Sequence, residues 1–230
     1  MTPDPVPVPV RWPKAWRLIR SIFPPIDLFE DIADPHDWEA LASAESKTNP
    51  RIWAHLGRLD LVPPARRVSG PGASLVMAPF VHVSTDRPGR FTDGTYGVYS
   101  AGNREEVALR EVAHHHARFM AASAEAPGWT SQFRMLVARL DTSLHDLRDI
   151  AAVHDLLDYA MPQELGRQLR EAGSNGVLYR SVRCENGECV GLFWPDLIST
   201  PVQADHYDFH WDGNSVDMVR NCTSQAIFAL

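Results

Sequence analysis

The segment that decides the fold, residues 89–111, reads GRFTDGTYGVYSAGNREEVALRE. Arg90 stands between Pro88-Gly89 and Asp93-Gly94, so it is predicted to lie in a loop. Val98-Tyr99 ends a short run of β-branched and aromatic residues, which is typical of a strand. The segment therefore predicts a loop that leads into a strand.

A helix is predicted to follow this strand. Asn103 is a favoured N-cap residue, and Glu106 three positions later completes a capping-box pattern. Glu111 then lies two turns inside the helix. Together with Arg90 and Tyr99 it gives a cation, an aromatic ring and a carboxylate near one junction, a set that can hold a charged, phosphorylated ligand. The alternative is a solvated loop followed by an amphipathic helix.

Composition limits the classes of function. The chain has 230 residues and a formal net charge of −7. This charge argues against direct binding to nucleic acid or to an anionic membrane, because both favour basic surfaces. No apolar run approaches the length of a membrane span, and residues 1–10 lack the basic and apolar regions of a signal peptide. Three cysteines without zinc-site spacing favour a reducing cytoplasm.

Before the deciding segment, two stretches have clear patterns. Residues 1–13 are rich in proline and are expected to be extended or frayed. Trp16–Ile19 is the first predicted strand. Residues 75–84, LVMAPFVHVS, are interpreted as one or two strands interrupted at Pro79.

After the deciding segment, the pattern alternates between helices and strands. The helix is predicted to continue to Met120 with a buried face that includes His116 and Phe119. Residues 131–140 predict a strand, residues 144–149 a turn, and residues 150–160 a helix. Residues 163–172 predict a helix that Gly173 closes.

A hairpin is predicted near the C-terminal end. Residues 176–183 form its first strand, Asn186-Gly187 its turn and residues 189–194 its second strand. Cys184 and Cys189 would then face each other across the hairpin, and two free thiols are favoured because the cytoplasm is reducing. These patterns predict a single α+β domain.

Two motifs contain reactive residue types but lack the arrangement that metal binding or nucleophilic catalysis needs. His114, His115 and His116 are consecutive, so on a helix they diverge by about 100° and do not chelate one ion together. No metal is expected. Ser181 lies in a predicted strand without the sharp turn or base that a serine nucleophile needs, so it is interpreted as a hydrogen-bond donor to a ligand or as an outward strand residue.

The sequence resembles the RES-domain family, whose members are toxins of RES–Xre toxin–antitoxin pairs. The similarity is carried by Trp16-Arg17-Leu18, Gly89-Arg90-Phe91, Val98-Tyr99-Ser100 with Ala108-Leu109-Arg110-Glu111-Val112, and residues 177–193 with Ser181. The segments PPIDLFEDIAD (24–34) and TNPR (48–51) resemble a subgroup with an extended N-terminal part.

The resemblance implies an ADP-ribosyltransferase-like α+β fold, with a split β-sheet core and flanking helices. Residues 1–14 are expected to form a flexible, proline-rich N-terminus. Residues 15–230 are expected to form one RES domain, with an extended N-terminal part over residues 15–75 and a catalytic core over residues 76–200.

The resemblance also implies that NAD is the substrate and that no metal is needed. Glu111, Arg90 and Tyr99 are the implied catalytic residues, and Arg17, Arg90, Tyr99 and Ser181 the implied NAD-binding residues. In this hypothesis the arginines bind the pyrophosphate, Tyr99 stacks on the nicotinamide, and Glu111 stabilises a ribosyl cation. Ser181 binds the ligand or orients Glu111.

The function that follows is that of a cytoplasmic toxin that cleaves NAD at the nicotinamide–ribose bond by hydrolysis or phosphorolysis. Its implied partner is an Xre-type DNA-binding antitoxin. One alternative is an ADP-ribosyltransferase that modifies a specific host protein. The other is a binding module without enzymatic activity.

Overall fold

The computed structural model describes residues 5–23, 34–49 and 51–230. The PPIDLFEDIAD segment lies outside the described residues except for Asp34, and so does Pro50 of the TNPR segment.

In the described ranges the helices are α1 (Trp38–Glu45), α2 (Ile52–Leu56), α3 (Ala73–Val81), α4 (Glu105–Ala122) and α5 (Ala160–Glu171). Short 3₁₀ turns are η1 (Leu59–Leu61), η2 (Pro64–Arg66), η3 (Ala151–His154) and η4 (Pro195–Leu197). The strands are β1 (Pro7–Arg20), β2 (Tyr99–Gly102), β3 (Thr130–Asp146), β4 (Gly176–Arg180), β5 (Glu188–Leu192), β6 (Val202–Trp211), β7 (Val216–Asn221) and β8 (Ile227–Ala229). None of the helices in these ranges combines the length and apolar character needed to cross a bilayer.

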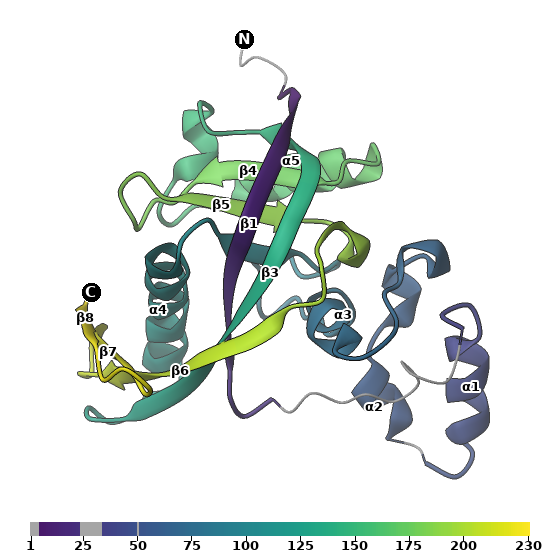
Figure 1. Cartoon of the computed structure of the whole chain (residues 1–230), viewed down its shortest axis with the longest axis horizontal. Coiled ribbons are helices and arrows are strands. Elements are labelled where there is room, and N and C mark those ends of the chain that lie inside the picture. Colours follow the sequence, from purple (N-terminus) through teal and green to yellow (C-terminus); the bar gives the residue numbers. More distant parts are fainter. Residues whose placement is uncertain (1–4, 24–33, 50) are drawn as a thin grey trace.

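The described strands form one 8-stranded mixed sheet in the order β1-β2-β5-β4-β3-β6-β7-β8, and β1 also pairs with β3. The β1–β3 pairing is antiparallel and runs over almost all of β1, whereas β1–β2 and β3–β4 meet at only one and two residue pairs. These short pairings close a ring through β1, β2, β5, β4 and β3. Figure 1 shows β1 and β3 crossing β4 and β5 steeply, so the sheet is divided into two parts. The prediction of an α+β fold is confirmed.

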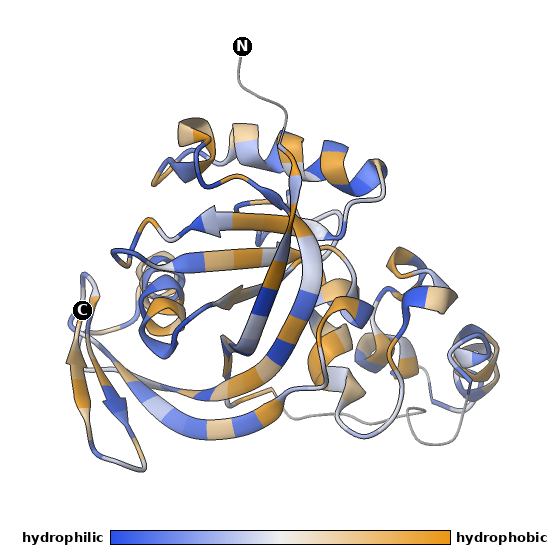
Figure 2. Ribbon diagram, turned by 45° about the horizontal axis from the view of Figure 1, so that its top comes forward, coloured by the Kyte–Doolittle hydropathy of each residue, from blue (hydrophilic) through white to orange (hydrophobic). Residues whose placement is uncertain are grey.

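Helices cover the sheet over three apolar clusters. Helix α4 packs against β3, β6 and β7; α5 and η3 lie over β4; and α3 packs against β1 and β2. Figure 2 shows apolar residues alternating with polar ones along β3 and β6, as expected for strands with one covered face. A cavity lies between β1, β2 and α4.

Residues 1–13 were expected to be extended or frayed, and from Pro7 onward they are extended and ordered as part of strand β1. Residues 7–12 pair in register with β3, and the Val6 carbonyl accepts a hydrogen bond from the Asp146 backbone N–H at 3.0 Å. In a strand, alternate residues direct their backbone groups to opposite sides. Val6, Val8 and Val10 direct their backbone groups to β3. Pro7 and Pro9 direct theirs to the unpaired side, where the lack of an N–H costs no hydrogen bond. Proline at every second position is therefore compatible with an edge strand.

The prediction of one or two strands over residues 75–84 is wrong, because residues 75–81 belong to helix α3 and residues 82–84 follow its end. Its buried residues, Ala73, Val76, Met77 and Phe80, recur at the spacing of one helix face. A short, wholly apolar run does not distinguish a buried helix from a strand by its pattern. Pro79 lies inside the helix and removes one backbone hydrogen bond there.

Helix α4 begins differently from the predicted capping box. Its N-cap residue is Arg104, and no side chain caps it. The Asn103 side-chain oxygen instead accepts a hydrogen bond from the Glu188 backbone N–H at 3.1 Å, and the Asn103 backbone N–H donates to the Glu188 carbonyl at 2.9 Å. Asn103 thus joins the end of β2 to the start of β5. The predicted buried face is present, except that Phe119 is 46% exposed.

The predicted two-residue hairpin turn is a seven-residue loop, residues 181–187, between β4 and β5. The Ser181 hydroxyl accepts hydrogen bonds from the backbone N–H groups of Arg183 and Cys184, which turns the chain out of the strand. Cys189 pairs with Tyr179 across the hairpin, so it does not face Cys184. Both cysteines are free thiols, as expected.

Between β3 and α5 the observed element boundaries differ from the predicted ones. Strand β3 continues to Asp146, through half of the predicted turn, because residues 145 and 146 pair with β4. The predicted helix over residues 150–160 is only the short turn η3. Helix α5 ends as predicted at Gly173, whose φ is 82°.

Arg67 connects separate segments within the N-terminal helical part, residues 35–67. Its guanidinium donates to the carbonyls of Val62, Pro35 and Leu59 and forms a bidentate pair with Glu39. The side chain of Arg67 is 1% exposed. Every N–H donor of the group is therefore satisfied inside the protein.

The Arg67→Ala variant is expected to lower the free energy of unfolding by about 3 kcal/mol, because the buried acceptors lose their partner. For a chain of this size that corresponds to a fall in Tm of about 6–12 °C. Thermal unfolding measures it. Arg58→Ala, which removes only an exposed pair with Asp60, is the control and should leave Tm unchanged. An equal, small shift in both variants would show that Arg67 does not hold this part in place.

His116 makes stability depend on pH. Its ring is buried among Phe119, Phe133 and Phe209, and burial lowers its pKa to about 4. The ordinary value is 6.5, so between pH 6.5 and pH 4 the unfolded chain binds the proton more strongly. Stability is therefore expected to fall as pH drops through this window.

Urea unfolding at pH 7 and pH 4.5 measures the effect. The contribution of His116 is expected to be roughly 2–3 kcal/mol lower at pH 4.5. His116→Leu removes this part of the pH dependence, whereas His36→Leu, at an exposed position, keeps it. If the His116→Leu protein lost as much stability on acidification as the unchanged protein, another group would be responsible.

Candidate active site

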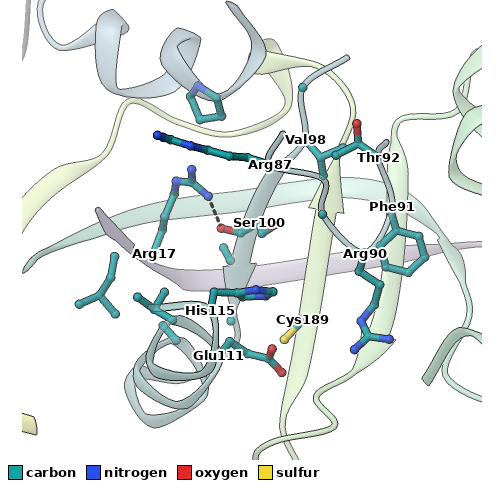
Figure 3. A pocket seen from close by; sticks show the side chains of 18 of the residues that line it. Arg17, Arg87, Arg90, Phe91, Thr92, Val98, Ser100, Glu111, His115 and Cys189 are labelled. Atoms are coloured by element: carbon teal, nitrogen blue, oxygen red, sulfur yellow. Dashed lines mark hydrogen bonds between the residues drawn. The ribbon is translucent and has the colours of Figure 1, made fainter. Parts of the chain in front are cut away.

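A cavity of about 370 Å³ lies between β1, the loop before β2, β2 itself and α4. Its charged lining residues are Arg17, Arg87, Arg90 and Glu111, and His115 lies beside them (Figure 3). Three guanidinium groups face one carboxylate, in a chain whose net charge is −7. The cavity is therefore locally cationic and suits an anionic ligand. Its size is in the range of small-molecule sites.

The loop that carries Arg90 is packed tightly against its neighbours. Gly94 has a φ of 89°, and a Cβ there would lie 2.2 Å from the Ser84 carbonyl oxygen. A Cβ on Gly97 would lie 2.1 Å from the carbonyl oxygen of Pro79 in α3. The absence of a side chain at both positions lets the loop follow α3 and brings Arg90 to the cavity wall.

Glu111 projects from α4 into the cavity (Figure 3) and is held at both carboxylate oxygens. Oε1 accepts a hydrogen bond of 2.6 Å from the Ser181 hydroxyl, and Oε2 accepts one of 2.9 Å from the Arg183 guanidinium. The Glu111 side chain is 17% exposed and that of Arg183 is 9% exposed. Charge-assisted hydrogen bonds of this kind fix the position of the carboxylate.

Ser181 is not among the residues that line the cavity. Its hydroxyl donates to Glu111 and accepts two backbone N–H bonds from its own loop. Of the two roles considered from the sequence, its contacts match the orientation of Glu111.

Arg90 lines the cavity, and one nitrogen of its guanidinium is engaged by the protein backbone. Nη1 donates to the carbonyls of Val153 and Asp155 at 2.8 and 2.7 Å, and the group stacks over the Tyr159 ring at 4.5 Å. Nη2 is buried without a partner in the described parts of the chain. The hydroxyl of Tyr159 in turn accepts a hydrogen bond of 3.2 Å from Arg183. One tyrosine thus joins Arg90 to the group that holds Glu111.

Tyr99 does not have the expected role. It is fully buried in the core, and the cavity lining contains its neighbour Ser100 instead. Residues alternate between the two faces of β2, so Tyr99 points into the core and Ser100 to the cavity. A buried ring does not stack on a ligand, so the sequence hypothesis for Tyr99 is wrong. The ring instead supports Arg17, whose guanidinium lies 4.7 Å above it.

Arg17 reaches the cavity from β1. Its Nη1 donates to the Ser100 carbonyl at 2.9 Å, and its Nε is buried without a partner in the described ranges. Burial lowers the pKa of Arg17 from the ordinary 12.5, but a guanidinium stays charged at neutral pH. Arg17 therefore keeps an N–H donor and its charge for a ligand.

Sequence reasoning missed four residues of the site. Arg183 and Tyr159 hold Glu111 and Arg90, and Arg87 and His115 line the cavity. His115 could have been identified from the sequence, because it follows Glu111 by one helical turn and so lies on the same face of the helix. The contacts of Arg183 depend on the path of the loop after β4, which no local pattern predicts.

Protonation states follow from the surroundings. Partial burial of the ring, together with Arg183, Arg118 and Arg90, lowers the pKa of His115 to about 4, although the residue as a whole is exposed to solvent. Burial raises the pKa of the Cys189 thiol, and the nearby Glu111 raises it further. At neutral pH the cavity therefore presents a neutral imidazole and an unreactive thiol.

The described residues contain no cluster of three or more His, Cys, Asp or Glu side chains arranged to bind a metal. What the cavity does contain is a fixed carboxylate within a cationic wall. Such an arrangement can bind a phosphorylated ligand and stabilise positive charge that develops next to the carboxylate.

The fold and site together define a protein with a small-molecule cavity for an anionic ligand. Residues 64–212 match the RES domain, which is more than half of the chain, and the protein belongs to the RES-domain family. The uncharacterized protein y4oC of Sinorhizobium fredii (strain NBRC 101917 / NGR234) is 26% identical over 209 residues, covering 89% of this chain and 85% of that protein.

Among solved structures, the crystal structure of the M. tuberculosis MbcT–MbcA toxin–antitoxin complex contains a similar chain. The TM-score is 0.45 and the identity 9%, with 89% of this chain and 87% of that chain covered.

Proposed function

We propose that the protein cleaves NAD⁺ at the bond between nicotinamide and ribose. The observation that carries the proposal is the Glu111 carboxylate, held by Ser181 and Arg183 inside a cavity lined by arginines. NAD⁺ combines the two features that this cavity fits: an anionic pyrophosphate and a cationic reacting centre. Membership of the RES-domain family supports the same substrate.

In the proposed reaction, the C1′–N bond breaks and its electron pair leaves with nicotinamide, which becomes neutral. The ribose is left as an oxocarbenium-like cation, and Glu111 stabilises it electrostatically. An acceptor oxygen or nitrogen then bonds to C1′ and loses its proton. Ser181 and Arg183 hold the Glu111 carboxylate in place, and its proposed role is electrostatic.

The arginines divide the binding of the ligand between them. Arg17 has a free N–H donor and lies with Arg87 on one side of Glu111 (Figure 3), so this pair is proposed to bind the pyrophosphate. Nη1 of Arg90 is occupied by two carbonyls, whereas its Nη2 has no partner in the described ranges. Its proposed role is to add positive charge to the cavity and to hold the neighbouring loop and the Tyr159 ring in position.

The acceptor is proposed to be water or inorganic phosphate, and a protein side chain is the second candidate. One feature favours a protein acceptor. The loop whose Asp155 carbonyl binds Arg90 also carries Leu156 and Leu157, whose side chains are 56% and 78% exposed. Such an apolar tip beside a site is a surface that a protein acceptor can contact.

In the cell, the protein is proposed to act as the toxin of a toxin–antitoxin pair in the cytoplasm, neutralised by an Xre-type DNA-binding antitoxin. The RES-domain family supports this assignment. Residues 15–230 are proposed to be one functional unit with its catalytic core in residues 76–200. Expression of the chain alone is expected to stop growth, and co-expression of the antitoxin encoded beside it is expected to restore growth.

The test is incubation of the purified protein with NAD⁺ labelled in its adenylate half, with and without phosphate. Loss of NAD⁺ with formation of ADP-ribose indicates hydrolysis, and a phosphate-dependent product indicates phosphorolysis. Label on protein indicates ADP-ribosyl transfer. If NAD⁺ persists in every condition and expression leaves growth unaffected, the protein is a binding module and the proposal is wrong.

A further inference from the structure

His115 is a cavity residue that the proposed reaction has not yet used. It follows Glu111 by four positions in α4, so the two side chains share one face of the helix at a Cβ separation of about 5–6 Å. Figure 3 shows the imidazole projecting into the cavity between the side chains of Arg17 and Glu111. The ring therefore lies between the proposed pyrophosphate site and the reacting carboxylate.

The ring nitrogens of His115 are available to a ligand. Glu111 is engaged by Ser181 and Arg183, and Nη1 of Arg90 is engaged by two backbone carbonyls. His115 packs edge-on against His114, and its nitrogens have no hydrogen-bond partner in the described parts of the chain.

The charge on His115 decides which chemical group it suits. Arg183 and Arg90 face it from two loops, Arg118 and Glu111 lie on its own helix, and Arg17 and Arg87 line the same cavity. The residue is exposed to solvent, yet partial burial of its ring and the nearby arginines lower its pKa below the ordinary 6.5, so the imidazole is neutral at physiological pH. A neutral imidazole has one donor and one acceptor, which match a hydroxyl group better than a phosphate.

We infer that His115 hydrogen-bonds the 3′-hydroxyl of the nicotinamide ribose, while Glu111 accepts the 2′-hydroxyl. The inference rests on the proposed cleavage of NAD⁺. Along the ribose, C1′ carries the breaking bond, C2′ and C3′ carry the hydroxyls, and C5′ leads to the pyrophosphate. Glu111, His115 and Arg17 follow one another in the cavity in the same order (Figure 3). His115 thus positions the sugar so that C1′ stays beside the carboxylate.

The test pairs a protein variant with a substrate analogue. His115→Phe keeps a flat ring but removes both nitrogens, and NAD⁺ without the 3′-hydroxyl on its nicotinamide ribose removes the other partner. Either change alone is expected to lower kcat/KM about tenfold, and both together are expected to lower it no further, because each removes the same hydrogen bond. His114→Phe, the neighbouring position outside the cavity lining, keeps full sensitivity to the analogue.

The outcomes separate the inference from the function on which it rests. If the unchanged protein cleaves NAD⁺ but His115→Phe remains as sensitive to the missing 3′-hydroxyl as the unchanged protein, the inference is overturned and the proposed function stands. If the unchanged protein does not cleave NAD⁺, the proposed function fails first.

Discussion

The Glu111→Gln variant is expected to release nicotinamide from NAD⁺ about 10²–10³ times more slowly than the unchanged protein. Glutamine keeps the shape and an oxygen for the Ser181 hydroxyl, but it removes the charge that faces the developing ribosyl cation. The loss is expected in kcat, because the cation exists only in the transition state. Initial rates of nicotinamide release over a range of NAD⁺ concentrations measure it.

The contacts of Glu111 also decide the design of this experiment. Glu111→Ala would leave the Arg183 guanidinium buried without its partner, at a cost of about 3–5 kcal/mol in stability. Glutamine is therefore the better substitution, with circular dichroism as the check that the fold is kept. Glu106→Gln is the matched control, since Glu106 lies on the same helix in an exposed pair with Arg110. A Glu111→Gln protein with an unchanged kcat would rule out the electrostatic mechanism.

The Arg90→Ala variant is expected to raise the KM for NAD⁺ about tenfold or more. It removes a positive charge from the cavity, and it also releases the loop at Val153 and Asp155 and the ring of Tyr159. Stability should therefore fall together with affinity, as a lower Tm in the same preparation.

Two further variants separate these contributions. Arg90→Lys keeps the charge but does not reproduce both carbonyl bonds and the stacking, so its KM is expected to lie between those of Arg90→Ala and the unchanged protein. Arg180→Ala, at an exposed pair with Asp149, is the control and should keep the normal KM. An unchanged KM in Arg90→Ala would show that Arg90 has only a structural role.

The parts of the fold that sequence predicted well are those with a strong local pattern. The buried spacing of α4 and the glycine that ends α5 are local signals, and both elements were placed correctly. Strand β1 was missed in its first half because proline normally argues against a strand. Its acceptability depends on which side of β1 is paired, and only the tertiary structure determines that.

In the candidate site, too, some residues were predictable from the sequence and others depended on the tertiary structure. Arg17, Arg90 and Glu111 all line the cavity, and Ser181 holds Glu111, so the family pattern selected residues that lie together. Tyr99 was misassigned because an alternating strand does not reveal which face is covered, and a shift by one residue exchanges core and cavity.

Arg183 and Tyr159 show why the rest of the site was not predictable. They meet Glu111 and Arg90 from separate loops, and their contacts depend on how those loops leave the sheet. His115 is different, because its spacing from Glu111 was sufficient to place it on the same helix face. A search for polar residues one turn from a suspected catalytic carboxylate would have found it.

The most direct test of the central claim is a crystal structure of the Glu111→Gln protein with NAD⁺, since slow turnover preserves the ligand. The expected result is NAD⁺ in the cavity, with its nicotinamide ribose beside position 111 and His115 and its pyrophosphate on Arg17 and Arg87. If saturating NAD⁺ left the cavity without ligand, or bound with the nicotinamide ribose away from position 111, the assignment of this cavity as an NAD⁺-cleaving site would be contradicted.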